Sequence, residues 1–307
     1  MKQDRDAAPT ASWTAIMLRI ITLLLAALAG LVTLMTGPAL ADGQRTGSFV
    51  FADWDGPPLR VFFAEPDAPY MDGAPVVFVL HGVNRNADDY ARNWEALART
   101  YGLRIYAPEF TNRAFPGAAM YNLGGLGTDG PYAFSAFEPL FEAVVARGGD
   151  ADGYHLFGHS AGAQVVHRAV LMENLPHLIT AYAANAGWYT LPHGGPTWPY
   201  GLGGTDIGEV ELRRWLQAPM MLLLGDQDID PDHENLRRTP EAMAQGPHRY
   251  ARGAYFAAVG RASARDIGAR FNWQVASVPG VAHDNAGMAE AAAAIIARRP
   301  DGFPANP

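Results

Sequence analysis

The residues "FGHSAGAQ" at 157–164 set Ser160 between two glycines, where one sequence pattern gives way to another. The apolar run at 154–157 is typical of a strand, and "AGAQVVHRAVLM" at 161–172 is typical of a helix. A serine at such a junction is either a nucleophile or an ordinary helix N-cap. The choice depends on whether the rest of the chain supplies a base, an acid and an oxyanion site in a suitable order.

On both sides of this junction, strand-like and helix-like segments alternate. Residues 48–54 and 59–65 indicate two strands joined by a turn, which predicts an opening β-hairpin. This alternation predicts an α/β fold with a mostly parallel sheet and helices on both faces. In such sheets ligands bind at the carboxyl ends of the strands. Further strands are predicted at 76–80, 103–110, 154–160, 178–184, 220–226 and 271–278, and helices at 87–102, 137–149, 161–172, 209–216, 239–267 and 286–299.

Polar residues that suit nucleophilic catalysis follow three of these strands. Ser160 follows one strand, a group of aspartates follows another, and His283 follows the last. A serine hydroxyl needs an adjacent imidazole to take its proton, and a carboxylate must hold that imidazole in one tautomer. The order serine, acid, histidine therefore favours a nucleophile over a cap. The residues alone leave open which of Asp226, Asp228 and Asp230 is the acid.

This arrangement resembles the α/β-hydrolase family over nearly all of residues 42–307. The glycines around Ser160 match the family's G-x-S-x-G elbow, and the chain order serine, acid, histidine is the family's order. The resemblance implies Ser160, Asp228 and His283 as the catalytic residues, with Asp228 preferred because it lies three positions after Gly225. It also implies that backbone N–H groups of Val83 and Ala161 form the oxyanion hole.

Two long loops rich in aromatic residues, glycine and proline, 109–134 and 185–204, are expected to shape the substrate site. Trp188 and Tyr189 in the second loop are candidates to stack on a substrate, or else they pin the loop to the body. Asn84 and His159 are further substrate-binding candidates, with packing beside the elbow as the alternative for His159. His81 is expected to support the oxyanion loop. Four arginines in rim segments either bind an anionic substrate or are simply solvated: Arg85, Arg113, Arg237 and Arg238.

Residues 185–208 are too short and too rich in glycine and proline for a separate helical lid, so no large cap domain and an open cleft are expected. An open cleft with aromatic walls resembles secreted serine esterases, among them poly(3-hydroxybutyrate) depolymerase-like and feruloyl-esterase-like proteins. The predicted function is cleavage of small or polymeric carboxylic esters. A secreted serine peptidase or amidase, and a non-catalytic binding protein of the same fold, are the alternatives.

Residues 1–41 have the pattern of a signal peptide. Basic residues precede an apolar run at 20–35, and Ala39-Leu40-Ala41 offers the small side chains that signal peptidase accepts. Cleavage would leave a catalytic domain at 42–307 that is secreted or periplasmic and does not stay inserted in a membrane. The apolar run is shorter than the roughly 20 residues that span a bilayer.

Composition narrows the partners and cofactors. The 307 residues carry a net charge of −8, which argues against nucleic acid as a partner. The absence of cysteine excludes disulfides, thiolate metal sites and a cysteine nucleophile. No histidines occur at metal-ligand spacing and no glycine-rich run opens a helix as a phosphate site would, so neither metal nor cofactor is predicted.

Overall fold

The computed structural model describes residues 45–67 and 73–298. The chain divides after Gln44, and all the strands and helices below belong to the second unit, Arg45–Pro307. The predicted signal peptide 1–41 and its cleavage site lie outside the described residues. No helix in the described part of the chain is both long enough and apolar enough to cross a bilayer.

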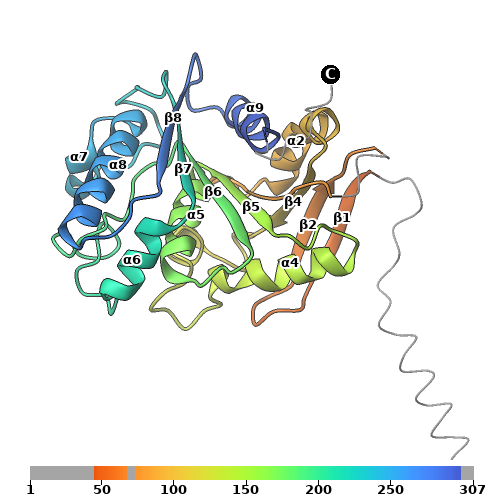
Figure 1. The fold of residues 1–307 in the computed structure, drawn as a ribbon, viewed down its shortest axis with the longest axis horizontal. Helices are drawn as coiled ribbons and strands as arrows, with labels where there is room; N and C mark the ends of the chain where they lie inside the picture. Colours follow the sequence, from red (N-terminus) through yellow and green to blue (C-terminus); the bar gives the residue numbers. More distant parts are fainter. Residues whose placement is uncertain (1–44, 68–72, 299–307) are drawn as a thin grey trace, which may run out of the picture. The chain divides into compact units, whose positions relative to one another are not determined.

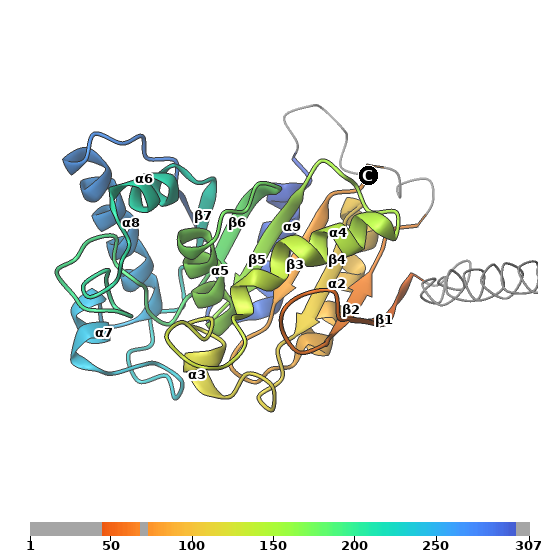
Figure 2. The ribbon, with the colours of Figure 1, turned by 90° about the horizontal axis from the view of Figure 1, so that it is seen from below.

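Eight strands form one open sheet in the order β1-β2-β4-β3-β5-β6-β7-β8. β1 pairs antiparallel with β2, and β2 antiparallel with β4, whereas every other neighbouring pair is parallel. The predicted hairpin followed by a mostly parallel sheet is therefore confirmed, and Figure 2 shows the hairpin at one edge of the sheet. The strands are β1 Thr46–Phe51, β2 Leu59–Ala64, β3 Val76–Leu80, β4 Arg104–Glu109, β5 Tyr154–His159, β6 Leu178–Ala184, β7 Met220–Gly225 and β8 Gln274–Val278.

Helices cover both faces of this sheet, as Figure 1 shows, with α2 and α9 together on one side and α4, α5 and α6 on the other. The five residues of β3 are all buried because Val77 and Val79 pack towards α2 and α9, while Val76, Phe78 and Leu80 pack towards α4 and α5. The helices are α2 Ala87–Tyr101, α3 Gly117–Met120, α4 Phe137–Ala146, α5 Ala161–Met172, α6 Glu209–Gln217, α7 Pro240–Gln245, α8 Arg249–Asp266 and α9 Asn285–Ile296, with the 3₁₀ turn η1 Ala133–Ala136.

Several predicted segments differ from the structure by one to three residues at their ends, for example the helix predicted at 137–149, which ends at Ala146, and two differences have a clear cause. The helical region expected over 239–267 is two helices, because Gly246 takes a φ of 147° between α7 and α8 and Pro247 follows it. The last strand begins at Gln274 instead of 271, since the Asn272 N–H bonds to Leu216 O outside the sheet. The segment 185–208 contains no helix, in agreement with the expected lack of a large cap.

The carboxyl ends of the strands are tied to one another by backbone hydrogen bonds. The Ser160 N–H bonds to Ala184 O and the Asn185 N–H bonds to Leu223 O, which links the ends of β5, β6 and β7. The Gln227 N–H bonds to Val281 O, which links the loop after β7 to the loop after β8. The polar residues that follow these strands therefore meet at one edge of the sheet.

Candidate active site

Ser160 lies in a strained turn between β5 and α5, with φ 57° and ψ −113°. Such a positive φ is uncommon for a residue other than glycine. The flanking glycines make the turn sterically feasible: a Cβ on Gly158 would lie 2.4 Å from the Gly162 carbonyl, and one on Gly162 would lie 2.2 Å from Leu80 O. The Ser160 side chain makes no capping bond to α5, so it does not serve as an N-cap.

His283 lies between Ser160 and an aspartate. The Ser160 hydroxyl lies 3.0 Å from His283 Nε2, and His283 Nδ1 lies 2.8 Å from Asp228 Oδ2. Asp228 is only 2% exposed. The other two aspartates do not contact His283: Asp226 accepts a bond from the Gly280 N–H, and Asp230 accepts one from the Asp232 N–H. The geometry thus unites the serine, the histidine and one aspartate and leaves the other two as turn caps.

Arg249, which the sequence analysis did not single out, lies beside Asp228. Its Nη1 is 3.2 Å from Asp228 Oδ1, and the guanidinium is buried at the start of α8. Burial lowers the pKa of His283, the positive charge of Arg249 lowers it further, and the bond to Asp228 opposes both effects. An arginine in "PHRYARG" carries no sequence signal of this role, because its partner is 21 residues away.

Two more histidines flank the His283 ring, with centroids 4.6 Å away for His159 and 5.2 Å away for His233. His159 is buried, and its Nδ1 lies 3.1 Å from the hydroxyl of Tyr90. Burial and the neighbouring His283 hold the pKa of His159 well below its usual value, so this ring is neutral. In the described residues, no group of three histidine, aspartate or glutamate side chains is placed to hold a metal ion.

The backbone N–H groups of Val83 and Ala161 have no acceptor in the part of the chain that the structure describes. His81 supports the Val83 turn from below: it donates from Nδ1 to Gly82 O at 3.0 Å, and its Nε2 accepts from the Phe110 N–H at 3.1 Å. Burial lowers the pKa of His81 to about 3, which keeps the ring neutral and suited to this donor–acceptor pair.

The cleft at Ser160 has two lobes that share Val83, Ser160 and Asn235. The histidine lobe, about 240 Å³, is lined by His283, His159, Asn84, Asn86, Asp89 and Asn285. The arginine lobe, about 170 Å³, is lined by Ala161, Asn122, Gln164, Gly187, Trp188 and Arg237.

The structure separates the two aromatic candidates of the second loop. Trp188 lines the arginine lobe, although only 3% of it is exposed. Tyr189 is fully buried and stacks on Phe256 with a centroid distance of 4.4 Å. Tyr189 lines neither lobe, so the structure favours the other of the two expectations for this residue, that it pins the loop to the body.

The four rim arginines also separate. Arg85 donates to the carbonyls of Phe110 and Gly117, so it holds the neighbouring loop. Arg238 pairs with Asp232 at 3.6 Å. Arg113 is exposed and does not line either lobe. Of these four, Arg237 alone lines the cleft.

Asn185 is a second residue that the sequence analysis missed. It takes a φ of 47°, its Oδ1 accepts from the Gly225 N–H at 2.8 Å, and its Nδ2 donates to Ala282 O at 3.0 Å. It therefore fixes the strand ends that precede Asp228 and His283. A lone asparagine after a strand gives no warning of this role.

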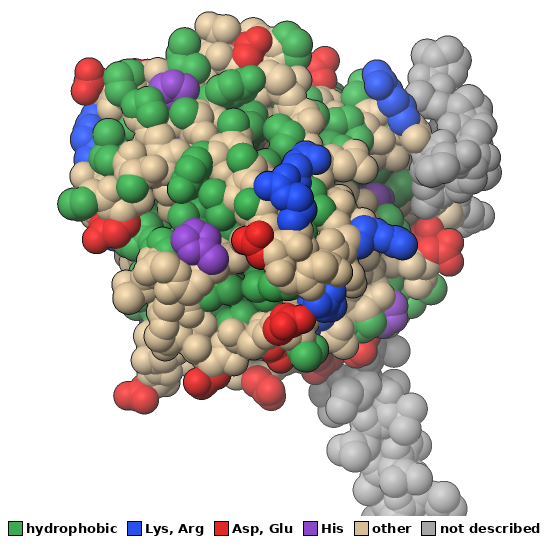
Figure 3. All heavy atoms as spheres, turned by 60° about the vertical axis from the view of Figure 1, so that its left-hand side comes forward, with side chains coloured by type: hydrophobic (Ala, Val, Ile, Leu, Met, Phe, Trp, Pro, Cys, Tyr) green, Lys and Arg blue, Asp and Glu red, His purple; other side chains and the backbone are tan. Residues whose placement is uncertain are grey.

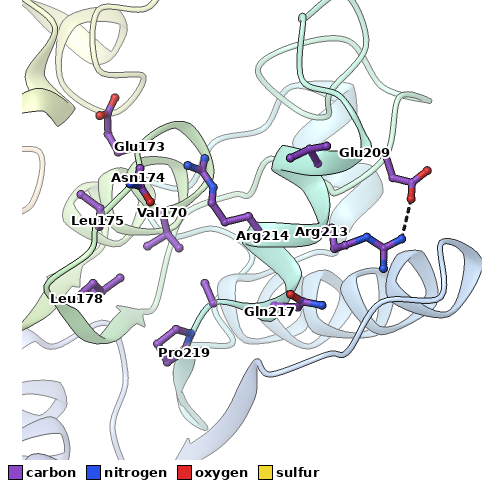
Figure 4. A pocket seen from close by; sticks show the side chains of 12 residues that line it. Val170, Glu173, Asn174, Leu175, Leu178, Glu209, Arg213, Arg214, Gln217 and Pro219 are labelled. Atoms are coloured by element: carbon purple, nitrogen blue, oxygen red, sulfur yellow. Dashed lines mark hydrogen bonds and ion pairs between the residues drawn. The ribbon is translucent and has the colours of Figure 1, made fainter.

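A larger hollow of about 710 Å³ lies between the end of α5 and α6. Figure 4 shows its side chains, with Arg213 paired to Glu209. Neither Ser160 nor His283 lines it. Size alone therefore does not identify the site in this chain.

Comparison with known proteins gives the following results. No family model matches the chain, and no curated protein matches it. The solved structure of poly(aspartic acid) hydrolase-1 from Sphingomonas sp. KT-1 is 39% identical over 82% of this chain and 98% of that chain, with a TM-score of 0.77. LpqC, a poly(3-hydroxybutyrate) depolymerase from Bordetella parapertussis, is 36% identical over 86% and 94%, also with a TM-score of 0.77. The esterase Est22 is 17% identical over 86% and 83%, with a TM-score of 0.53, and shares the fold alone.

Proposed function

The chain belongs to the α/β-hydrolase family, and from this premise we propose that it is a serine hydrolase that cleaves carboxylic esters through an acyl-enzyme. The observation that carries the proposal is the unbroken contact from Ser160 Oγ through His283 to Asp228, at 3.0 and 2.8 Å. This contact lies at the carboxyl edge of the sheet, where α/β proteins bind ligands.

In the proposed reaction, His283 Nε2 takes the Ser160 proton as Oγ attacks the ester carbonyl carbon. Asp228 holds His283 in the Nδ1–H tautomer and stabilises its positive form. The free N–H groups of Val83 and Ala161 stabilise the negative charge that develops on the carbonyl oxygen. His283 then gives the proton to the leaving alcohol, and water attacks the acyl-enzyme by the same route in reverse.

Amide cleavage is a second candidate with a specific observation behind it. The relative from Sphingomonas is named for poly(aspartic acid), whose units are joined by amide bonds, whereas the relative from Bordetella is named for a polyester. The same three residues support both reactions. Purified protein offered acyl esters of graded length, a film of poly(3-hydroxybutyrate) and peptide amides will separate the two, and ester turnover is expected to be the faster.

The nucleophile is tested by labelling. A fluorophosphonate should phosphonylate Ser160 Oγ with loss of fluoride, which adds the mass of the phosphonyl group, and should fail to label Ser160→Ala. This variant should also lose ester hydrolysis by roughly 10⁶-fold in kcat. Ser135→Ala is the matched control, because its hydroxyl bonds only to Tyr132 O, away from the cleft. Labelling of any serine other than Ser160 would refute the proposal.

We further propose that the protein is exported to the periplasm or the medium and acts there without a metal or cofactor. The support is the signal-like pattern of residues 1–41. N-terminal sequencing of exported protein should begin at Asp42, and an exported protein that keeps Met1 would contradict cleavage.

A further inference from the structure

Three arginines near the cleft lack a carboxylate partner. Arg168, Arg237 and Arg252 form no ion pair within the described residues. Carboxylates are not scarce, since the chain has 31 acidic residues against 23 basic ones, and both kinds reach the surface in Figure 3. What sets Arg168 and Arg252 apart is their burial, since the other two buried arginines of the described residues, Arg104 and Arg249, each have a carboxylate partner.

Arg168, on α5, is the most unusual of the three, because it is fully buried and one of its guanidinium nitrogens has no hydrogen-bond partner among the described residues. Its Nε donates to Thr190 Oγ1 at 2.9 Å and its Nη1 donates to Asn122 O at 3.0 Å, but its Nη2 has no partner in the part of the chain that the structure describes. An uncompensated buried charge is costly to a protein. Burial and nearby Arg237 lower the pKa of Arg168 to about 9, which still leaves it positive at neutral pH.

Arg237 brings a second positive charge to the cleft surface. Its Nε donates to the Tyr200 hydroxyl at 2.6 Å, which holds the guanidinium over the Trp188 ring, 5.2 Å from the centroid. Arg168 lies 4.2 Å from the same ring. The terminal Nη atoms of Arg237 have no partner among the described residues, and such a fork matches the two oxygens of a carboxylate.

Arg252 fixes the backbone around this fork. It is buried and donates from Nη1 to Gly187 O at 2.6 Å and from Nη2 to Arg237 O at 2.9 Å. Both acceptor residues line the arginine lobe. The fork is thus presented by a braced segment, as a binding group needs to be.

The position of His283 assigns the two lobes to the two halves of a substrate. In the proposed reaction His283 protonates the leaving group, so that group must occupy the histidine lobe, which His283 lines. The acyl half then extends the other way, past Ala161 and towards Arg237. The histidine lobe is lined by no arginine or lysine of the described residues, and its one carboxylate, Asp89, is paired with Arg92, so this lobe offers an anion no positive partner.

We propose that the arginine lobe is a subsite for a carboxylate on the acyl half of the substrate, so that the preferred substrates are esters of dicarboxylic acids that keep one free carboxylate. This inference rests on the proposed function, because it uses the attack of Ser160 and the proton transfer by His283. The anion supplies the charge that Arg168 and Arg237 lack in the free protein.

The test compares two esters with the same leaving group and the same acyl length. These are the mono(4-methylumbelliferyl) ester of glutaric acid and 4-methylumbelliferyl pentanoate, which differ in one terminal carboxylate. The protein should prefer the glutarate in kcat/KM. Arg237→Gln should lower kcat/KM for the glutarate by about 10- to 100-fold, mainly through KM, and change that for the pentanoate by less than about 3-fold.

The control variant is Arg238→Gln, which removes a neighbouring arginine that pairs with Asp232 and does not line the cleft. This variant should leave kcat/KM for both esters unchanged. The subsite would be overturned if the unaltered protein showed no preference for the glutarate ester in kcat/KM. It would also be overturned if Arg237→Gln, at an unchanged melting temperature, lost kcat/KM equally for both esters. If Arg237→Gln fails to fold, competitive inhibition of the unaltered protein by free glutarate, with none by pentanamide, supports the subsite, and equal inhibition overturns it.

The same experiment separates this inference from the proposed function. If the pentanoate ester is cleaved and this cleavage depends on Ser160, the proposed hydrolase function stands even when the protein shows no preference for the glutarate ester. Absence of cleavage of both esters, together with absence of labelling at Ser160, removes the proposed function itself.

Discussion

Two buried arginines on different sides of the cleft differ in how their charge is balanced. Arg249 lies 3.2 Å from Asp228, which also holds His283. Arg168 is buried as deeply, but among the described residues its hydrogen bonds go to a hydroxyl and to amide or carbonyl oxygens, and it lies over the Trp188 ring. The charge of Arg249 is paired within a closed group of three side chains, Arg249, Asp228 and His283. The charge of Arg168 has no anion among the described residues.

The difference indicates which side is complete without a ligand. On the side of Arg249 the charges are paired inside the protein, so the histidine and its acid are held in place before any substrate binds. On the side of Arg168 the protein leaves a positive field in the arginine lobe, which only an incoming anion can balance. Charges that are already paired around His283 favour catalysis, because the catalytic groups need not rearrange. An unpaired positive charge at the arginine lobe favours selectivity for anionic substrates.

The largest effect is expected for Asp228, the member of the closed group that holds His283 for proton transfer. Asp228→Asn should still fold, with lower stability because the buried Arg249 loses its counter-charge. It should present His283 in the wrong tautomer, with a loss of about 10⁴ in kcat, as that exchange causes in a related triad. Asp226→Asn is the matched control, because Asp226 caps a turn and does not contact His283. Measured kcat values and thermal melts decide, and a greater kcat loss in Asp226→Asn would show that the acid is misassigned.

The next largest effect, on stability, is expected when Arg249 is removed from the closed group. Arg249→Met leaves Asp228 buried with His283 as its main partner, and stranding one member of a buried pair costs about 3–5 kcal/mol. Arg249→Lys keeps a positive charge there and should recover part of the loss. Urea unfolding of the two variants measures it, and equal stability of both with the unaltered protein would mean that the pair contributes nothing.

The pH dependence gives a smaller effect on the same side. His283 must be neutral to accept the Ser160 proton, so activity is lost as the pH falls through its pKa. Burial, the charge of Arg249 and the neighbouring His233 lower that pKa, whereas Asp228 acts in the opposite direction and the buried His159 beside the ring is neutral. The acid limb of kcat/KM should lie below the ordinary histidine value of about 6.5.

Arg249→Met should move this acid limb to higher pH, because it removes a positive charge that lowers the pKa of His283. Arg249→Lys should move it less. Profiles of kcat/KM between about pH 4 and 8 measure the shift, and an acid limb that moves to lower pH in Arg249→Met would contradict this account of the electrostatics.

These regions also differ in how far the sequence could predict them. The mostly parallel sheet could be inferred because strands and helices alternate with strong periodicity, and the elbow because its serine and both glycines lie within five consecutive residues at the junction of a strand and a helix. Arg249, Asn185 and Arg168 could not be inferred, since their partners lie 21, 40 and 46 residues away for the bonds to Asp228, Gly225 and Asn122. The side on which Tyr189 packs depends on Phe256 of α8, which local sequence does not specify.

The smallest effect is expected from the unpaired arginine, and it tests the contrast most directly. Arg168→Met removes a buried charge that has no carboxylate partner, so it strands no counter-charge. It leaves acceptors such as Thr190 Oγ1 and Asn122 O with one bond fewer, a cost of about 1–3 kcal/mol, and the relief of an unpaired charge offsets part of it. Urea unfolding should therefore place Arg168→Met well above Arg249→Met in stability. If Arg168→Met proves the less stable of the two, its charge is balanced within the protein after all, and the two sides of the cleft do not differ in their charge balance.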